Sequence, residues 1–95
     1  MARLGLRRFT VFMEKRHPNL VKLGKKIRDQ RKQKGFSQEA LATEAQLGRS
    51  YMGRIERGEQ NLSIQNLIQI ALNLKVEVGE LIPPIKQLKS PDNKH

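Results

Sequence analysis

The chain of 95 residues has no cysteine and no tryptophan, and only four aromatic residues in all. Without cysteine there can be no disulfide framework and no thiolate metal site, which fits the reducing cytoplasm where we expect this protein. With so few aromatics, the 37% of apolar residues must form a core mainly of Leu, Ile, Val and Ala, which favours helices packed on helices. No apolar run approaches the roughly 20 residues that a membrane-spanning helix requires.

Acidic residues are scarce at the start of the chain. Residues 1–35 hold only Glu14 and Asp29 against twelve lysines and arginines, whereas residues 36–58 are balanced and residues 59–82 are slightly acidic. The net charge of +10 is therefore polarised, which indicates one face that meets a polyanion. Nucleic acid and an anionic membrane surface are the two candidates, and a basic solubilising tail is the plain alternative.

Capping signals divide the chain into five short helices. Pro18 followed by Asn19 indicates a helix start with the asparagine as cap, and Gly35 indicates a left-handed helix end. Ser37 and Ser63 are further N-cap candidates. The expected helices cover about residues 20–34, 38–45, 49–57, 64–74 and 77–82.

These signals predict a compact all-α domain over residues 20–82, with a basic N-terminal extension over 1–19 and a flexible C-terminal tail over 83–95. In the fourth expected helix, apolar residues at helical spacing predict one buried stripe. That stripe comprises Ile64, Leu67, Ile68, Ala71 and Leu74. Ile70 and Leu72 fall partly outside it, which hints at a second buried face.

The second and third expected helices are separated only by residues 46–48, so they must cross steeply and closely. Ala42 supplies the small residue that such a crossing needs, and Met52 and Ile55 would hold the third helix to the core. This arrangement predicts a helix-turn-helix, whose second helix enters the major groove of DNA.

The outward face of that third helix carries residues suited to reading bases. Arg49 and Arg54 can bond guanine in a bidentate way, and Ser50 can bond several base edges. Gln38, at the start of the second helix, can reach a backbone phosphate. A solvated polar face is the alternative, and it is at least as good a reading for Arg57.

The stretch SQEALATEAQLGRSYMGRIERGE, followed by NLSIQNLIQIALNLKVEVGELI, resembles the phage-repressor and Cro-type (XRE) helix-turn-helix family. Within that family, RSYMGRIERGEQNLS is most similar to the controller proteins of restriction–modification systems. The resemblance implies a lambda-repressor-like domain, a DNA-binding transcriptional regulator of a restriction–modification operon, and no cofactor. Gln46 stands where the family usually has Gly or Asn, so a left-handed backbone there would cost roughly 1 kcal/mol.

The resemblance also implies roles for individual residues. It puts Arg49, Ser50 and Arg54 at base edges in the major groove. It puts Gln38, Tyr51, Gln60 and Asn61 at the DNA backbone or nearby, and it implies an ion pair between Arg31 and Glu56. Each of these residues is present at the matching position.

The two last helices offer more apolar surface than a small monomer readily covers. We therefore expect a two-fold homodimer, which would set two recognition helices about 34 Å apart on a pseudo-palindromic operator. The expected interface residues are Leu67, Ile70, Leu81 and Ile82.

Other functions are less well supported by the sequence. His17 and His95 are isolated, so no metal site is expected, and the serines have no His and Asp partners for catalysis. The alternative function is the antitoxin half of a toxin–antitoxin pair, which would bind a protein partner through residues 1–19 or the apolar patch. A membrane-surface role would rest only on the basic start of the chain.

Overall fold

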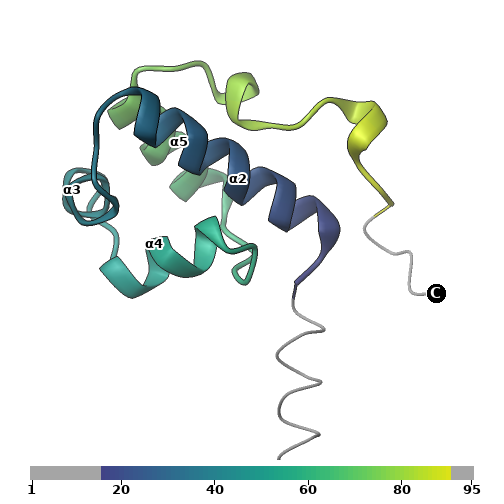
Figure 1. The fold of residues 1–95 in the computed structure, drawn as a ribbon, viewed down its shortest axis with the longest axis horizontal. Helices are drawn as coiled ribbons and strands as arrows, with labels where there is room; N and C mark the ends of the chain where they lie inside the picture. The colour runs from purple at the N-terminus through teal and green to yellow at the C-terminus, as the bar shows by residue number, and fades with distance from the viewer. Residues whose placement is uncertain (1–15, 91–95) are drawn as a thin grey trace, which may run out of the picture.

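The computed structural model describes residues 16–90, and these residues form helices and no strand. Their order along the chain is visible in Figure 1. The elements are α2 (Pro18–Gln33), α3 (Gln38–Glu44), α4 (Arg49–Glu56), α5 (Ile64–Leu74) and the 3-10 helices η1 (Val78–Leu81) and η2 (Ile85–Gln87). The prediction of an all-α fold is confirmed, and the fifth expected helix is the short 3-10 helix η1. Residues 1–15 and 91–95, which include most of the predicted extension and the end of the predicted tail, lie outside the described residues.

The helix starts follow the capping signals with one exception. The hydroxyl oxygens of Ser37 and Ser63 accept backbone N–H bonds three residues ahead, at 3.0 and 3.1 Å. The cap of α2, however, is His17 and not Asn19, because His17 Nδ1 accepts the N–H of Asn19 at 3.0 Å. Pro18 then occupies the first helical position, where its lack of an N–H costs nothing.

A residue with a left-handed backbone conformation follows each of the four α-helices described. Gly35 and Gly58 have φ values of 83° and 76°, as expected for glycine just beyond a helix. Gln46 and Lys75 adopt φ of 60° without being glycine. The left-handed turn that the sequence predicts at Gln46 is therefore present, with its modest strain.

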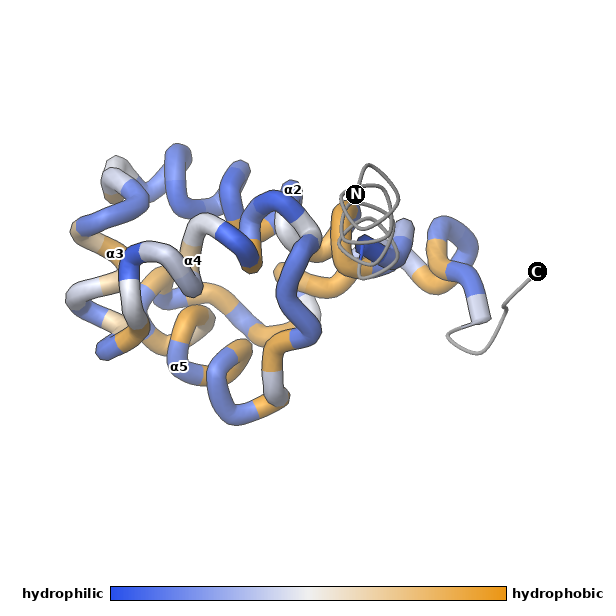
Figure 2. Tube along the Cα trace, turned by 90° about the horizontal axis from the view of Figure 1, so that it is seen from below, coloured by the Kyte–Doolittle hydropathy of each residue, from blue (hydrophilic) through white to orange (hydrophobic). Residues whose placement is uncertain are grey.

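The buried core lies between α5 and the other helices, with α5 forming the most hydrophobic segment in Figure 2. It is built from aliphatic side chains and one methionine. These are Ile27, Leu41, Ala42, Met52, Ile55, Leu67, Ile70, Ala71, Leu74 and Leu81.

The predicted stripe on α5 is partly wrong. Ile70 is fully buried, whereas Ile64, Ile68 and Leu72 are 62%, 36% and 66% exposed. The reason is that α5 packs against both α3 and η1, which turns the face centred on Ile70 and Leu74 inward. Ile64, Ile68 and Leu72, which are spaced four residues apart, therefore remain on the surface.

Gly24 lets α2 and α4 touch. A Cβ built at Gly24 would lie 2.7 Å from the backbone oxygen of Glu56, closer than any real side chain allows. No side chain at this position can therefore fit without separating the two helices, and the position of α4 against the core depends on it.

The segment after η1 runs back to the start of α2. Asn19 makes two hydrogen bonds to the backbone of Lys89, donating to its carbonyl at 2.7 Å and accepting its N–H at 2.8 Å. Lys22 also donates to the carbonyl of Gln87. Within residues 16–90, then, the part of the predicted tail that is described is tied to the first helix across about 70 residues of sequence.

Candidate nucleic-acid interface

α3 and α4 form a helix-turn-helix. Ala42 and Leu41 of α3 are buried at the crossing, as predicted. A hydrogen bond of 2.8 Å from the Leu47 N–H to the Ala42 carbonyl closes the turn, and Gln46 within the turn has a left-handed backbone. This closure is the six-to-one bond of a Schellman motif, and it sets the direction in which α4 leaves the turn.

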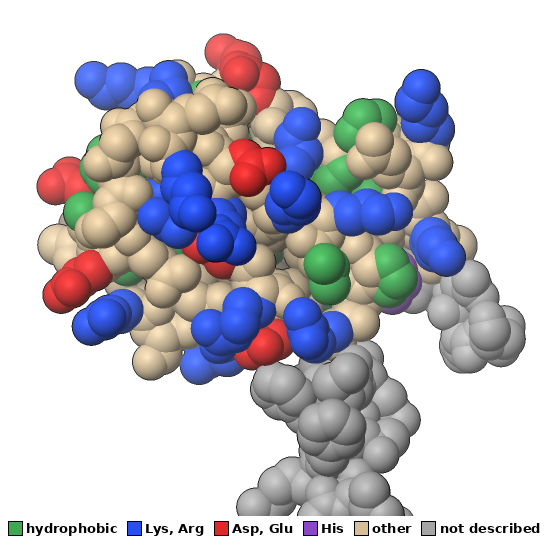
Figure 3. Space-filling view, viewed as in Figure 1, with side chains coloured by type: hydrophobic (Ala, Val, Ile, Leu, Met, Phe, Trp, Pro, Cys, Tyr) green, Lys and Arg blue, Asp and Glu red, His purple; other side chains and the backbone are tan. Residues whose placement is uncertain are grey.

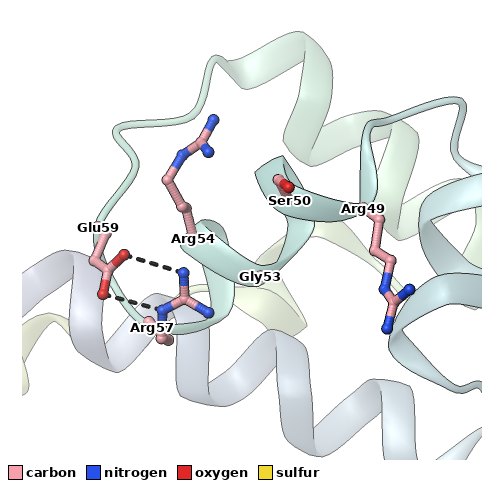
Figure 4. A pocket seen from close by; sticks show the side chains of 6 residues that line it. All are labelled: Arg49, Ser50, Gly53, Arg54, Arg57 and Glu59. Carbon is pink, nitrogen blue, oxygen red and sulfur yellow. Dashed lines mark hydrogen bonds and ion pairs between the residues drawn. The ribbon is translucent and has the colours of Figure 1, made fainter.

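α4 has a buried and an outward face. Met52 and Ile55 lie in the core, as the sequence predicts, while Arg49 and Ser50 are exposed and Arg54 is half-buried. Figure 4 shows the outward side chains around the middle of the helix. The first turn of α4, where a recognition helix meets base edges, is therefore open to solvent.

Arg49 is held only weakly in the free protein. Its side chain is 73% exposed, and its Nη1 lies 3.8 Å from Oε1 of Glu39, which is itself exposed. An exposed pair at this distance is worth about 0–1 kcal/mol, so another acceptor can readily displace Glu39. In Figure 4 the Arg49 side chain points away from Arg54, so the structure does not bring these two guanidinium groups together.

Arg54 and Tyr51 form a second polar group on the same helix. Arg54 Nε donates to Oε1 of Gln60 at 3.3 Å, and its guanidinium lies 5.9 Å from the centre of the Tyr51 ring. The Tyr51 hydroxyl accepts a bond from Asn66 Nδ2 at 2.9 Å. These contacts tie the outer side of α4 to the following loop and to α5.

The ion pair implied by the resemblance is present beneath this surface. Arg31 Nε and Nη2 donate to the two carboxylate oxygens of Glu56 at 2.7 and 3.0 Å, and the side chains are only 9% and 3% exposed. Arg31 Nη1 also donates to the carbonyl of Phe36 at 2.9 Å. Gln38, which the sequence places at a phosphate, donates to Glu56 Oε1 at 3.0 Å and so also has a structural role that the sequence did not indicate.

Sequence reasoning missed a second ion pair at the end of α4. Arg57 Nε and Nη2 donate to the carboxylate of Glu59 at 3.0 and 3.2 Å, and the Glu59 side chain is only 8% exposed. The left-handed Gly58 brings the two side chains together, so the motif Arg-Gly-Glu was the available signal. The pair holds the Arg57 guanidinium over Gly53, at the side of α4 that carries Ser50 (Figure 4).

These side chains enclose an open depression of about 560 Å³. Its lining is formed by Arg49, Ser50, Gly53, Arg54, Arg57 and Glu59. A second depression lies next to it, between the start of α2 and the loop after α4, where Gln60 and Asn61 face His17 and Leu20. Lys and Arg side chains are spread over the face of the molecule shown in Figure 3, and such positive charge suits a polyanion.

Comparison with known proteins gives the family. A family model described as helix-turn-helix matches residues 27–81, which is more than half of the chain. The chain belongs to the phage-repressor and Cro-type helix-turn-helix family.

Several relatives of this helix-turn-helix protein are controllers of restriction–modification systems. The control protein C.MunI from a Mycoplasma species is 35% identical over 68 residues, covering 70% of this chain and 92% of that protein. The crystal structure of the controller protein C.AhdI from Aeromonas hydrophila matches with a TM-score of 0.68 and 44% identity, over 70% of this chain and 100% of that one. The regulator SinR, solved in complex with DNA, matches with a TM-score of 0.60 and 42% identity, over 62% of this chain and 95% of that one.

The comparisons confirm the predicted family, the helix-turn-helix fold and the assignment to DNA-binding transcription regulators. Within residues 16–90, no group of three or more His, Cys, Asp or Glu side chains could hold a metal ion. No helix in that part of the chain is both long and apolar enough to cross a membrane.

Proposed function

We propose that this helix-turn-helix protein binds as a homodimer to a pseudo-palindromic operator and regulates a restriction–modification operon. The observation that carries the proposal is the exposed start of α4, where Arg49 and Ser50 face solvent directly after the turn that joins α3 to α4. The similarity to control proteins such as C.MunI supports the choice of operon.

In the proposed complex, Arg49, Ser50 and Arg54 read base edges in the major groove. Arg49 leaves its weak partner Glu39, and Arg54 exchanges its long bond to Gln60 for an acceptor on guanine. Each exchange breaks a surface contact of small net value, so most of the energy of the new bonds is available for binding.

Backbone contacts come from the residues around the recognition helix. Asn61 is exposed in the loop after α4, and Gln60 becomes free when Arg54 turns to DNA. The Tyr51 hydroxyl accepts from Asn66 but keeps its own hydrogen, and the Gln38 amide uses only one of its two hydrogens on Glu56. Both residues can therefore donate to a phosphate without losing their contacts within the protein.

Gel-shift titration at fixed salt tests the base contacts. Arg49→Ala and Ser50→Ala should weaken binding to the operator while leaving binding to unrelated DNA nearly unchanged. Loss of a bidentate arginine contact corresponds to about 1–3 kcal/mol, or roughly a 5- to 150-fold loss of operator affinity. Lys25→Ala on α2 is the control, since any effect there should weaken all sequences alike. Full operator affinity in both α4 variants would disprove the site.

The proposed homodimer forms through aliphatic side chains of α5 that are exposed in the protomer. Of the interface residues that the sequence predicts, Leu67, Ile70 and Leu81 are buried in the core of the protomer and cannot be the contact surface. Ile82 is 39% exposed and remains a candidate at the edge.

The contact surface proposed instead consists of Ile64, Ile68 and Leu72, which lie four residues apart on one side of α5. A two-fold axis beside this helix would leave both α4 helices free to enter successive major grooves.

Sedimentation or light scattering tests this interface. Leu72→Glu should convert the dimer to a folded monomer, because it would bury a charge without a partner. Ile85→Glu is the matched control, since Ile85 is 83% exposed but lies on η2, away from α5. A Leu72→Glu protein that stays dimeric would contradict the assignment. The operon is tested separately by whether restriction endonuclease and methyltransferase genes adjoin the gene of this protein.

A further inference from the structure

The segment that follows η1 places two lysines beside the start of α2. Asn19 donates to the carbonyl of Lys89 at 2.7 Å and accepts the Lys89 N–H at 2.8 Å, and Lys22 donates to the carbonyl of Gln87. These bonds use the backbone of the segment, and the side chains of Lys86 and Lys89 are exposed. In Figure 1 the yellow end of the described chain lies beside the start of α2.

Positive charge is concentrated in the two segments that meet here. Neither residues 16–28 nor residues 82–90 contain an acidic residue. The ion pairs found within residues 16–90 leave out all four basic side chains of this junction. These side chains are those of Arg16, Lys22, Lys86 and Lys89. Such a group of cations suits a polyanion.

The start of α2 is tied to the C-terminal end of α4. Arg16 Nη2 donates to the backbone carbonyl of Arg57 at 3.1 Å, across 41 residues of sequence. Arg57 is the C-cap of α4, where backbone carbonyls lack partners within the helix and a cation is favoured. The junction is thus attached to the helix that we propose reads DNA.

The junction also adjoins the loop that we propose contacts DNA phosphates. One depression on the surface joins the start of α2 to that loop. Its lining residues are His17, Asn19, Leu20 and Asn61. Asn19 therefore shares a depression with Asn61 and at the same time holds the backbone of Lys89. The segment that carries Lys86 and Lys89 lies at the edge of the proposed DNA-binding surface.

We propose that residues 83–90 extend the DNA-binding surface, and that Lys86 and Lys89 bind operator phosphates next to those bound through Asn61. This inference rests on the proposed function and extends it to a segment beyond residues 27–81, which the family model matches. A lysine ammonium is a flexible point charge, so it binds phosphate and adds affinity and salt dependence without sequence preference. Asn19 is the positioning residue that holds the segment in place.

The salt dependence of operator affinity is the first test. In the proposed homodimer, Lys86→Gln/Lys89→Gln removes two phosphate contacts from each protomer. At about 0.9 per contact, the slope of log K against log[salt] should become shallower by up to about 3.6. Affinity for unrelated DNA should fall together with affinity for the operator, because phosphates carry no sequence information.

The matched control is Lys25→Gln/Lys75→Gln. It removes the same charge from the middle of α2 and from the end of α5, and neither lysine lines the depression that contains Asn61. The control should change the salt slope by less than half as much as Lys86→Gln/Lys89→Gln does. Equal changes of slope in the two double variants would overturn the proposal.

Phosphate ethylation interference is the second test, because ethylation removes the charge of one phosphate at a time. For the unmodified protein, ethylation should block binding at phosphates next to those whose effect is lost in Asn61→Ala. These neighbouring phosphates should lose their effect in Lys86→Gln/Lys89→Gln and keep it in the control. Asn19→Ala, which removes no charge, should lose it too, because Lys89 is no longer held beside α2. An unchanged interference pattern in the Lys86→Gln/Lys89→Gln protein would overturn the proposal.

The failure of this inference can be told from the failure of the proposed function. Arg49→Ala should lose operator preference but keep the part of the salt slope that depends on Lys86 and Lys89. If Arg49→Ala keeps its operator preference, the proposed function fails. If it loses that preference while Lys86→Gln/Lys89→Gln leaves the slope unchanged, only the role of the segment is refuted.

An anionic membrane surface is the competing partner for the two lysines. Binding to phosphatidylserine vesicles at physiological salt that depends on Lys86 and Lys89, together with an unchanged DNA salt slope, would refute the segment as a DNA contact.

Discussion

Replacing Glu56 by alanine should lower the free energy of unfolding by about 3–5 kcal/mol, the usual cost of removing one partner from a buried pair. The Glu56 carboxylate accepts three hydrogen bonds, two from Arg31 and one from Gln38, and its side chain is 3% exposed. In its absence the buried Arg31 guanidinium keeps, among residues 16–90, only the carbonyl of Phe36 as a partner. The total free energy of unfolding of a small domain is only about 5–15 kcal/mol, so this loss is large.

The assay is urea unfolding followed by circular dichroism, with the protomer concentration held constant because dimerisation would itself add stability. A loss of 3 kcal/mol should lower the melting temperature by about 12 °C or more. Arg31→Met should cost a similar amount, since it leaves the carboxylate without its cation. The double variant Arg31→Met/Glu56→Leu should recover most of the loss, because no charge remains buried.

The double variant also gives the result that would refute this reasoning. If its loss in free energy of unfolding equals the sum of the losses of the two single variants, the two side chains stabilise the fold independently. A loss below about 1 kcal/mol for either single change would show that water reaches the pair despite its burial. Operator affinity should be unchanged in the double variant at a temperature where it is folded, since neither side chain is assigned to DNA.

Three further substitutions test the fold. Gly24→Ala should destabilise the protein by about 1–3 kcal/mol, because its Cβ would lie 2.7 Å from a backbone oxygen of α4. Gly79→Ala, with no atom within 4 Å of the new Cβ, is the control and should change the stability by less than about 0.5 kcal/mol; equal losses in urea unfolding would contradict the close contact of α2 and α4. Gln46→Gly should raise the free energy of unfolding by up to about 1 kcal/mol by relieving the left-handed φ of 60°, and a decrease would show that the side chain contributes more than the strain costs. Asn19→Ala should speed hydrogen exchange at the Lys89 amide without affecting the middle of α2, and unchanged exchange would mean that this bond does not hold the segment.

Most helix boundaries could be predicted because their signals are local. Ser37 and Ser63 cap the helices that follow them, and Gly35 and Gly58 end helices in the left-handed conformation. Each of these effects involves neighbours within a few residues. The exception, His17 in place of Asn19, arises because proline suits the first helical position and so moves the cap back by two residues.

The buried face of α5 could not be predicted from spacing alone. This helix carries six aliphatic residues and one alanine in eleven positions, so more than one apolar stripe fits the pattern. Packing against α3 and η1 selects the face with Ile70 and Leu74, and leaves Ile64 and Leu72 at the surface. For the same reason, spacing alone could not show that Leu67 and Ile70, expected at the homodimer interface, are buried within the protomer.

The outward face of α4 was predictable, but the directions of its side chains were not. The spacing of Met52 and Ile55 predicts that Ser50 and Arg54 face away from the core. Arg49, three residues before Met52, is exposed because it is the first residue of α4. The acceptor that each arginine contacts belongs to a different segment of the chain, so the direction of the side chain depends on tertiary packing. Glu39 lies on α3, and Gln60 lies in the loop after α4.

The sequence by itself determined the family and the helix-turn-helix, and it indicated the helix that we propose reads DNA, because capping, helical periodicity and a recognisable motif act over short stretches of chain. Only the tertiary structure decided which side of α5 is buried, that the segment ending near Lys89 is tied to Asn19, and that Arg16 reaches the end of α4. Those contacts join residues far apart in the chain, and their geometry depends on how all the helices pack together.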